Sequence, residues 1–233
     1  MQLKIITTID GSHTLLVEEM GEHYHSTYGA ISESMHVYIN NALKPVMGRQ
    51  NVIHVLEIGF GTGLNAFLSF IESDNQKVEV NYTTIEPFPI DESIIKQLNY
   101  AKLIDNSSYL KLFNQIHQVE WNKRVELSPY FSIQKIDKKL QDVNLPPNYY
   151  NVVYFDAFAP DFQPELWTVD VFGKLYQSMQ DHSILMTYSA KGSVKRALKS
   201  AGFTVQNIAG PIGKREITKA LKILLKSNIA TLL

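Results

Sequence analysis

The sequence contains no cysteine. This absence excludes a disulfide framework, a thiolate zinc site, an iron–sulfur cluster and a cysteine nucleophile. An excess of charge of one sign is also lacking, because 22 Lys and Arg residues stand against 23 Asp and Glu residues, for a formal net charge of −1. The chain therefore has no global basic field of the kind that many nucleic-acid-binding proteins carry, and any contact with RNA must come from a local patch.

Long apolar runs are missing as well. No uninterrupted apolar stretch approaches the roughly 18 residues that a membrane-spanning helix requires. Residues 1–16 also lack the basic and then apolar pattern of a signal peptide. We expect a soluble, cytoplasmic protein without a membrane partner. At 233 residues and 45% hydrophobic content, the chain has the length for one well-packed domain with small additions.

Strand and helix patterns alternate along most of the chain. A hairpin is predicted around Asp10-Gly11, a dipeptide suited to a type I′ turn, and a helix is predicted to begin near Ser32. From residue 51 onward, we expect strands at 52–58, 78–86, 130–136, 149–158 and 183–189. We expect helices at 64–73, 91–104, 164–179 and 192–202. Residues 203–225 predict two further strands joined by a loop that contains glycine and proline.

This alternation predicts an α/β fold with a mainly parallel sheet covered on both faces and an antiparallel pair at one edge. The ending with two successive strands is similar to the sheet of class I S-adenosylmethionine-dependent methyltransferases (Rossmann-like), more than to a symmetric dinucleotide-binding fold. We expect residues 1–50 to form an N-terminal extension of a β-hairpin and a helix. Residues 51–233 would form the methyltransferase domain, and both parts would belong to one compact unit.

A glycine-rich stretch, EIGFGTG at residues 57–63, follows the predicted strand 52–58. Gly59, Gly61 and Gly63 allow a tight turn close to a ligand, while the next helix presents its N-terminal amides. A Walker loop would require Lys and then Ser or Thr after Gly63, but Leu64-Asn65 stands there. The dinucleotide fingerprint also fails at position 64. The acidic-x-G-x-G-x-G pattern of S-adenosylmethionine enzymes fits without a gap, and the alternative is an ordinary strand-to-helix turn.

Two acidic residues follow later strands. Glu86 comes 23 residues after Gly63 at a strand end, where its carboxylate can accept hydrogen bonds from both ribose hydroxyls. The alternative for Glu86 is a solvated glutamate at a strand tip. Asp137 is a candidate acceptor for an adenine amine, and its alternative is the N-cap of a helix formed by the residues that follow.

The stretch NVVYFDAFAPDFQPELW, at residues 151–167, holds the candidate catalytic residue. Its apolar run predicts a buried central strand, which places Asp156 at the carboxyl edge of the sheet, in the crevice of the glycine loop. A carboxylate among aromatic side chains is costly to bury unless a positive or proton-donating group meets it, and an amine would meet it. Phe158 and Pro160 would form a stiff apolar wall. Asp156 would accept the proton of the amine or orient it; the alternative is that it caps the next helix or touches the cofactor.

These motifs together resemble the methyltransferase domain of MnmC, a bacterial tRNA-modifying protein, and its single-domain relatives. The resemblance is carried, in the order of the family, by GFGTGLN, IEPFP, DAFAPDFQPELW, SAKGSVKRALKSAGFTVQ and GKRE, and it covers about residues 28–217. It implies methyl transfer from S-adenosylmethionine to the aminomethyl nitrogen of 5-aminomethyl-2-thiouridine at the tRNA wobble position, giving 5-methylaminomethyl-2-thiouridine. It implies the tRNA anticodon region as partner and no metal or flavin. This chain is too short for the oxidase domain of bifunctional members, so we expect a separate enzyme to supply the aminomethyl group.

The residues expected at the site form two groups. The cofactor is assigned to Glu57, Gly59, Phe60, Gly61, Gly63, Asn65, Glu86, Pro87, Asp137 and Asp156. The RNA substrate is assigned to Tyr28, Glu33, Phe158, Pro160, Lys214 and Arg215. Asp161 departs from the family pattern, which often has a basic residue after FAP, and Asp137 lacks the usual preceding glycine.

Further basic residues and other functions stay open at this point. Lys191, Lys195, Arg196 and Lys199 lie on a helix that either contacts phosphate or is a solvated charged face. The seven histidines show no HExxH spacing, and a metal site at His23 and His25 with Glu22 is an alternative. The alternative functions are a small-molecule N- or O-methyltransferase, a non-catalytic cofactor-binding interaction protein and, more distantly, a nicotinamide dehydrogenase.

Overall fold

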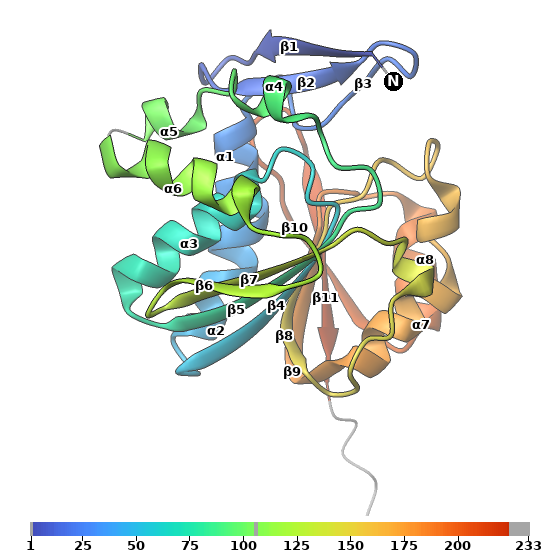
Figure 1. Ribbon diagram of the computed structural model, residues 1–233. Coiled ribbons are helices and arrows are strands. Elements are labelled where there is room, and N and C mark those ends of the chain that lie inside the picture. Colours follow the sequence, from blue (N-terminus) through green and yellow to red (C-terminus); the bar gives the residue numbers. More distant parts are fainter. Residues whose placement is uncertain (1, 105–106, 224–233) are drawn as a thin grey trace, which may run out of the picture.

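An eight-stranded mixed sheet forms the centre of the protein (Figure 1). The computed structural model describes residues 2–104 and 107–223. Within these residues the strand order is β10-β11-β9-β8-β4-β5-β7-β6. The strands are β4 (Val52–Ile58), β5 (Glu79–Ile85), β6 (Arg124–Ser128), β7 (Phe131–Ile136), β8 (Tyr150–Phe155), β9 (Met179–Thr187), β10 (Thr204–Ala209) and β11 (Glu216–Lys222).

The five central strands β9, β8, β4, β5 and β7 are parallel, and β11 pairs antiparallel with both β9 and β10. The predicted parallel sheet with an antiparallel pair at one edge is therefore confirmed. At the opposite edge, β6 adds an antiparallel strand that the sequence analysis did not predict. The chain builds outward from β4 through β5 to β7 and then returns to place β8 on the other side of β4, so the strand order reverses between β4 and β8.

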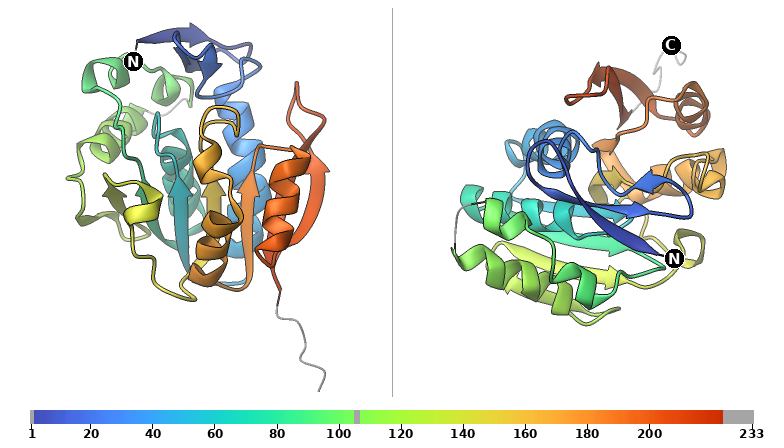
Figure 2. Two further views of the ribbon diagram at one scale, coloured as in Figure 1. Left: turned by 90° about the vertical axis from the view of Figure 1, so that its right-hand side faces the viewer. Right: turned by 90° about the horizontal axis from the view of Figure 1, so that it is seen from above.

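Helices cover both faces of this sheet (Figures 1 and 2). One face packs against the helical segments at residues 30–47, 64–76 and 107–118, and the other face packs against the helices at residues 169–178 and 192–200. All six residues of β8 are buried because this central strand is covered on both sides. The helices are α1 (Ala30–Ser34), the π-helix η1 (Met35–Leu43), α2 (Lys44–Met47), α3 (Leu64–Gln76), α6 (Ser107–Gln118), α7 (Val169–Ser178) and α8 (Gly192–Ser200).

The predicted helix 91–104 is wrong as a single element, because it is divided into α4 (Glu92–Ile95) and α5 (Tyr100–Leu103). Asn99 stands between them and turns its side chain to the N-terminal hairpin, where it donates to the carbonyl of Gly11 at 2.9 Å and accepts from the amide of His13 at 2.9 Å. The predicted helix 164–179 is likewise divided into a 3-10 turn, Pro164–Leu166, and α7. At Asn99, tertiary hydrogen bonds thus interrupt a pattern that is helical in sequence.

A small antiparallel sheet of β1 (Leu3–Thr7), β2 (His13–Val17) and β3 (Glu22–His23) lies across the carboxyl ends of the parallel strands (Figures 1 and 2). The predicted N-terminal hairpin is present, but the predicted type I′ turn is wrong. Thr7 pairs with His13, which leaves five residues in the loop, and Gly11 has a positive φ of 82° whereas Asp10 does not. The side chains of this longer loop also form hydrogen bonds with the helix that follows.

Asp10 and Ser12 of the hairpin loop cap the helix α1. The helix begins at Ala30, not near Ser32, and Gly29 supplies no side-chain cap. Instead, the Ser12 hydroxyl accepts from the amide of Ala30 at 2.9 Å, and the Asp10 carboxylate accepts from the amide of Ser32 at 3.0 Å. These bonds satisfy helix amides that would otherwise lack partners and join the small sheet to the main one.

We predict that Asp10→Ala lowers the free energy of unfolding by about 2 kcal/mol, because it removes a charged cap. Although burial raises it, hydrogen bonds from Ser12 and Ser32 hold the pKa of Asp10 well below its usual range. A lowered pKa contributes stability above the unfolded-state value, and that stability is lost as pH falls. In urea titrations, the variant should therefore approach the wild type in acid. Asp74→Ala, on an exposed position of α3, is the control; an equal loss in both variants would contradict the capping role.

Candidate active site

The glycine loop after β4 is shaped by a close approach of two strand ends. Gly59, Gly61 and Gly63 all have positive φ, at 92°, 47° and 72°. A Cβ atom at position 59 would lie 2.6 Å from the carbonyl oxygen of Asp156, and one at position 63 would lie 2.7 Å from Nε2 of His117. Side chains are therefore excluded both by backbone conformation and by space. The loop exposes its backbone to the cavity above it, as a ligand that lies against bare backbone requires.

Glu86 follows β5 and turns back to this loop. Its Oε2 accepts from the amide of Gly61 at 3.2 Å, and its Oε1 accepts from the amide of Phe88 at 2.9 Å. Burial raises the pKa of Glu86, while backbone hydrogen bonds from Phe88, Gly61 and Phe60 oppose that shift. The carboxylate is held at the strand tip beside the glycine loop, where it can accept hydrogen bonds from neighbouring hydroxyls of a ligand.

Asp156 follows β8 and lies beside the glycine loop, because its amide donates to the carbonyl of Ile58 at 2.9 Å. The Tyr38 hydroxyl donates to its Oδ1 at 2.6 Å, and the Asn65 amide donates to its Oδ2 at 2.8 Å. Burial raises the pKa of Asp156 to about 6 against these two hydrogen bonds. At neutral pH the carboxylate is therefore mostly ionised and close enough to titration to exchange a proton.

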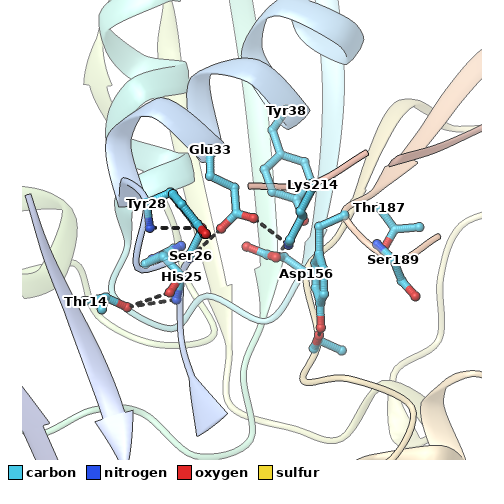
Figure 3. A network of polar contacts seen from close by, with 12 residues as sticks. Thr14, His25, Ser26, Tyr28, Glu33, Tyr38, Asp156, Thr187, Ser189 and Lys214 are labelled. Atoms are coloured by element: carbon cyan, nitrogen blue, oxygen red, sulfur yellow. Dashed lines mark hydrogen bonds and ion pairs between the residues drawn. The ribbon is translucent and has the colours of Figure 1, made fainter. Parts of the chain in front are cut away.

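An ion pair stands next to Asp156 (Figure 3). Lys214, from the loop between β10 and β11, donates to Oε1 of Glu33 at 2.6 Å, and its Nζ lies 4.3 Å from the centre of the Tyr188 ring. Glu33 is buried and its Oε2 accepts from the amide of Ser26 at 2.7 Å. The charge of Lys214 is thus balanced by Glu33, which leaves Asp156 as an acidic group without a salt-bridge partner among the described residues.

His25 follows the N-terminal sheet and bonds to two hydroxyl groups. Its Nε2 is 2.8 Å from the Thr62 hydroxyl, and its backbone amide donates to the Thr14 hydroxyl at 2.9 Å. Burial lowers the pKa of His25 to about 4, so its ring is neutral at pH 7. Among residues 2–104 and 107–223, no three His, Cys, Asp or Glu side chains come together in a way that could hold a metal ion.

These groups surround a cavity of about 1040 Å³, at the upper end of the ~300–1,000 Å³ typical of ligand sites. The cavity runs from Glu86 past the glycine loop and Asp156 to Lys214. Ten of the predicted site residues line it, namely Tyr28, Glu33, Gly59, Phe60, Gly61, Glu86, Pro87, Asp156, Phe158 and Lys214. The space accommodates one ligand against the glycine loop and a second one beside Asp156.

The other predicted residues lie outside the cavity wall, for different reasons. Gly63 and Asn65 lie behind it, the first against His117 and the second bonded to Asp156. Asp137 is exposed at a neighbouring hollow and accepts from the Asn122 amide at 2.7 Å. Pro160 and the exposed Arg215 are also outside the set of lining residues.

Glu57 is fully buried in β4, close to Tyr82 and Thr84 of β5, and does not line the cavity. Burial raises the pKa of Glu57 to about 8. The side chain is therefore mostly protonated at neutral pH and adds little negative charge near Asp156. Its position beneath the glycine loop makes it part of the frame that supports the loop.

Several residues at the site have no local sequence signal. Tyr24, Tyr38 and Tyr188 reach it from three separate segments, and only the fold brings them together. Tyr24 packs edge-on against Phe158 with ring centroids 4.9 Å apart, which gives the cavity an aromatic wall. Trp167 is buried, and its Nε1 donates to the carbonyl of Phe158 at 2.9 Å.

The predicted basic helix face is partly neutralised. Lys195 donates to Glu216 at 2.6 Å, and Lys191 forms an ion pair with Asp161. Asp161, which departs from the family pattern, therefore has a partner within the chain. In the part of the chain that the structure describes, no helix is both long and apolar enough to cross a bilayer.

The sheet with its reversal beside β4, together with the glycine loop and Glu86, defines a class I methyltransferase fold. The chain belongs to a family of S-adenosyl-L-methionine-dependent methyltransferases, whose sequence profile matches residues 98–223. The expected fold class and enzyme class are thereby confirmed. The bare backbone of the loop and the carboxylate beside it fit S-adenosylmethionine, which carries ribose hydroxyls and no phosphate.

Relatives with this domain are longer proteins. The chain is 28% identical over 220 residues to the tRNA 5-methylaminomethyl-2-thiouridine biosynthesis bifunctional protein MnmC of Burkholderia multivorans, covering 87% of this chain and 32% of that protein. The MnmC of Marinomonas sp. is 28% identical over 217 residues, covering 84% of this chain and 30% of that protein. The chain thus spans about a third of the length of these curated relatives.

Solved structures agree with the fold. MnmC2 from Aquifex aeolicus superposes with a TM-score of 0.78 at 26% identity, covering 94% of this chain and 70% of that one. Spermidine synthase from Thermotoga maritima superposes with a TM-score of 0.57 at 15% identity, covering 94% of this chain and 67% of that one, and shares the fold.

We predict that Glu57→Gln reduces the pH dependence of stability. Because the pKa of Glu57 is raised from 4.5 to about 8 in the folded state, its stabilising contribution is present in acid and lost as pH rises through about 8. Glutamine cannot ionise, so the variant should gain more than about 1 kcal/mol on the wild type between pH 5 and pH 8. Denaturant unfolding at both pH values measures this, with Glu126→Gln, on exposed β6, as control. Parallel pH profiles for wild type and variant would show that Glu57 is not protonated.

Proposed function

We propose that this chain transfers a methyl group from S-adenosylmethionine to the aminomethyl nitrogen of 5-aminomethyl-2-thiouridine at the wobble position of tRNA. The observation that carries the proposal is the acidic group at the centre of the cavity. Asp156 has two neutral donors and no ion-pair partner among residues 2–104 and 107–223, while the neighbouring Lys214 is already paired with Glu33. A site with one unbalanced carboxylate favours an acceptor that carries a protonatable nitrogen.

The cofactor half of the cavity is assigned to the glycine loop and Glu86. Gly59 and Gly61 would lie against the cofactor, Glu86 would accept from its ribose hydroxyls, and Phe60 and Pro87 would bound the same space. When bound there, S-adenosylmethionine supplies an electrophilic methyl group on a sulfonium. An adenine-binding role for Asp137 stays a prediction, because its carboxylate lies outside the main cavity and already accepts from Asn122.

The acceptor half is assigned to Asp156 and its surroundings. An aliphatic amine with an ordinary pKa of about 10.4 is protonated at neutral pH and has no free lone pair. Asp156 would bind the ammonium, accept its proton and hold the freed nitrogen in line with the methyl group. Phe158 and Tyr24 would keep water from this part of the cavity, since their rings form its wall.

The tRNA substrate is supported by the names of the relatives and by the cavity mouth. Exposed aromatic side chains line the cavity there, with Tyr28 at 47% and Phe88 at 62% exposure. They offer faces on which an unpaired anticodon base can stack. Lys139 lines the same cavity and Arg215 is exposed beside Lys214, so both can meet the phosphates of an anticodon loop. The charge for RNA binding is local, in keeping with a net charge of −1.

This proposal has consequences for the surroundings of the reaction. The aminomethyl group would come from a separate enzyme, and the reaction would take place in the cytoplasm, where tRNA is modified. No metal or flavin is needed for transfer from a sulfonium to an amine.

We predict that Asp156→Asn lowers the rate of methyl transfer at least ~100-fold, because the amide cannot accept the proton of the amine. Labelled S-adenosylmethionine and tRNA from a strain that lacks this activity would be incubated with each protein, followed by nucleoside analysis. Binding of S-adenosylhomocysteine should be unchanged, which controls for folding. If the wild type labels a small metabolite and never wobble uridine, the proposed substrate is wrong. Full activity of the variant would instead remove Asp156 from the mechanism.

We further predict that Lys214→Met raises the KM for the acceptor tRNA about tenfold, while the affinity for S-adenosylhomocysteine stays the same. The reason is that Lys214 and its partner Glu33 line the acceptor half of the cavity. Without the lysine, the buried Glu33 loses its cation and repels the RNA. Lys96→Met, at the C-cap of α4, should leave the KM for tRNA and the affinity for S-adenosylhomocysteine unchanged. An equal loss of cofactor affinity would place Lys214 in the other half of the site.

A further inference from the structure

Tyr38 is a buried residue in direct contact with the candidate catalytic group, although it does not line the cavity. Its side chain is 1% exposed, and its hydroxyl donates to Oδ1 of Asp156 at 2.6 Å across 118 positions of sequence. Burial and the neighbouring Asp156 raise the pKa of Tyr38 well above its usual range. The phenol therefore stays protonated and can donate to Asp156. Both residues are labelled in Figure 3.

The helix that carries Tyr38 is unusual at this point. Residues Met35–Leu43 form a π-helix between α1 and α2, and π-helical segments are rare and frequent at functional sites. Each inserted residue rotates the later side chains by about 100° relative to a regular helix. The Asn41 side chain donates to the carbonyl of His36 at 2.7 Å, which gives this backbone oxygen a hydrogen-bond partner within the wide turn. The π-helix thus has its own local support.

The two donors to Asp156 come from different elements on the interior side. Tyr38 approaches Oδ1 from η1, and Asn65 approaches Oδ2 from α3. Each carboxylate oxygen has a further lone pair, and Asp156 itself lines the cavity. The donors therefore occupy the inner side of the carboxylate and leave its outer side for the acceptor.

We propose that Tyr38 is a positioning residue for methyl transfer, which directs the outer lone pairs of Asp156 at the acceptor nitrogen and favours the charged form of the carboxylate. This inference rests on the proposed function of Asp156. It gives the π-helix a purpose, because the helix sets the direction from which the phenol reaches the carboxylate. Tyr38 donates throughout the reaction and never takes the proton itself.

Other charged and titratable groups also face Asp156. Glu33 from α1 raises the pKa of Asp156, and Lys214 from the β10–β11 loop lowers it. Glu57 from β4, which is mostly protonated, and Tyr188 after β9 interact with it electrostatically. Tyr82 of β5 lies farther within the same group. None of these residues changes when only the hydroxyl of Tyr38 is removed, so that substitution isolates the hydrogen bond.

The experiment compares Tyr38→Phe with Tyr154→Phe in the full chain. Tyr154 is also fully buried and packs against Tyr38 with ring centroids 5.0 Å apart. Its hydroxyl lies 3.2 Å from that of Ser69 and, among the described residues, forms no hydrogen bond with Asp156. The pH profile of kcat/KM for aminomethyl-containing tRNA is measured for each protein. For Tyr38→Phe, we expect the acidic limb to move up by about one pH unit, which by titration alone lowers the rate at pH 7 about twofold. The plateau rate above the limb should fall as well, because the carboxylate is no longer held in direction. The KM for S-adenosylmethionine should not change.

A second substitution covers the case in which Tyr38→Phe does not fold. Incorporation of 3-fluorotyrosine at position 38 makes the phenol a stronger donor, so the acidic limb should move down instead of up. Coincident profiles for the wild type and both Tyr38 variants would overturn the inference, as would an equal shift in Tyr154→Phe. If the wild type does not methylate the tRNA at all, the proposed function fails instead. Activity in the wild type with loss in Asp156→Asn separates the two outcomes.

Discussion

The contact between the ends of β4 and β8 is the constraint on which the rest of the site depends. The two parallel strands pair with Ile58 beside Phe155, so the residues that follow them leave the sheet at adjacent points. Gly59 is then so close to the Asp156 carbonyl that no side chain fits. This single approach puts the cofactor loop and the acid within one cavity. Position 59 therefore requires glycine because of the neighbouring strand end, whether or not a ligand is bound.

The N-terminal segment completes what the sheet begins. A sheet edge alone offers an open crevice, and the small sheet and α1 supply its roof, with Tyr24, His25 and Glu33 facing the cavity. Asp10 and Ser12 attach this roof by capping α1, and Asn99 attaches it from the other side. The hydrogen bonds of Asp10, Ser12 and Asn99 therefore hold the N-terminal segment in place. Other residues of the same segment line the cavity.

Local patterns predicted much of this arrangement. The apolar runs of β4 and β8, the glycine loop and the acids after the strands are each encoded within a few residues, and the structure places Gly59, Glu86 and Asp156 around one cavity. Tyr38 could not be found in this way, because nothing in its neighbourhood indicates a π-helix or a partner 118 positions away. Glu33 was expected at the RNA site and lines the cavity, but its ion pair with Lys214 was not predicted.

Other differences arise where side chains act at long range. The helix predicted at 91–104 is divided between Ile95 and Tyr100, and the side-chain amide of Asn99, just before the second part, bonds to the hairpin. The helix α6 was missed although a signal existed, since Leu112, Phe113 and Ile116 are buried on one face at helical spacing. Asp137 follows its strand as expected, yet Asn122 turns its carboxylate toward a separate hollow.

The bond between Glu33 and Lys214 joins positions 181 residues apart. During synthesis on the ribosome, the first of these residues emerges long before the second. Glu33 therefore lacks its lysine partner until the chain has been made as far as the loop between β10 and β11. The acceptor side of the cavity is therefore complete only when the loop between β10 and β11 has taken its place on the sheet, so this region acquires its geometry from contacts of the longest range.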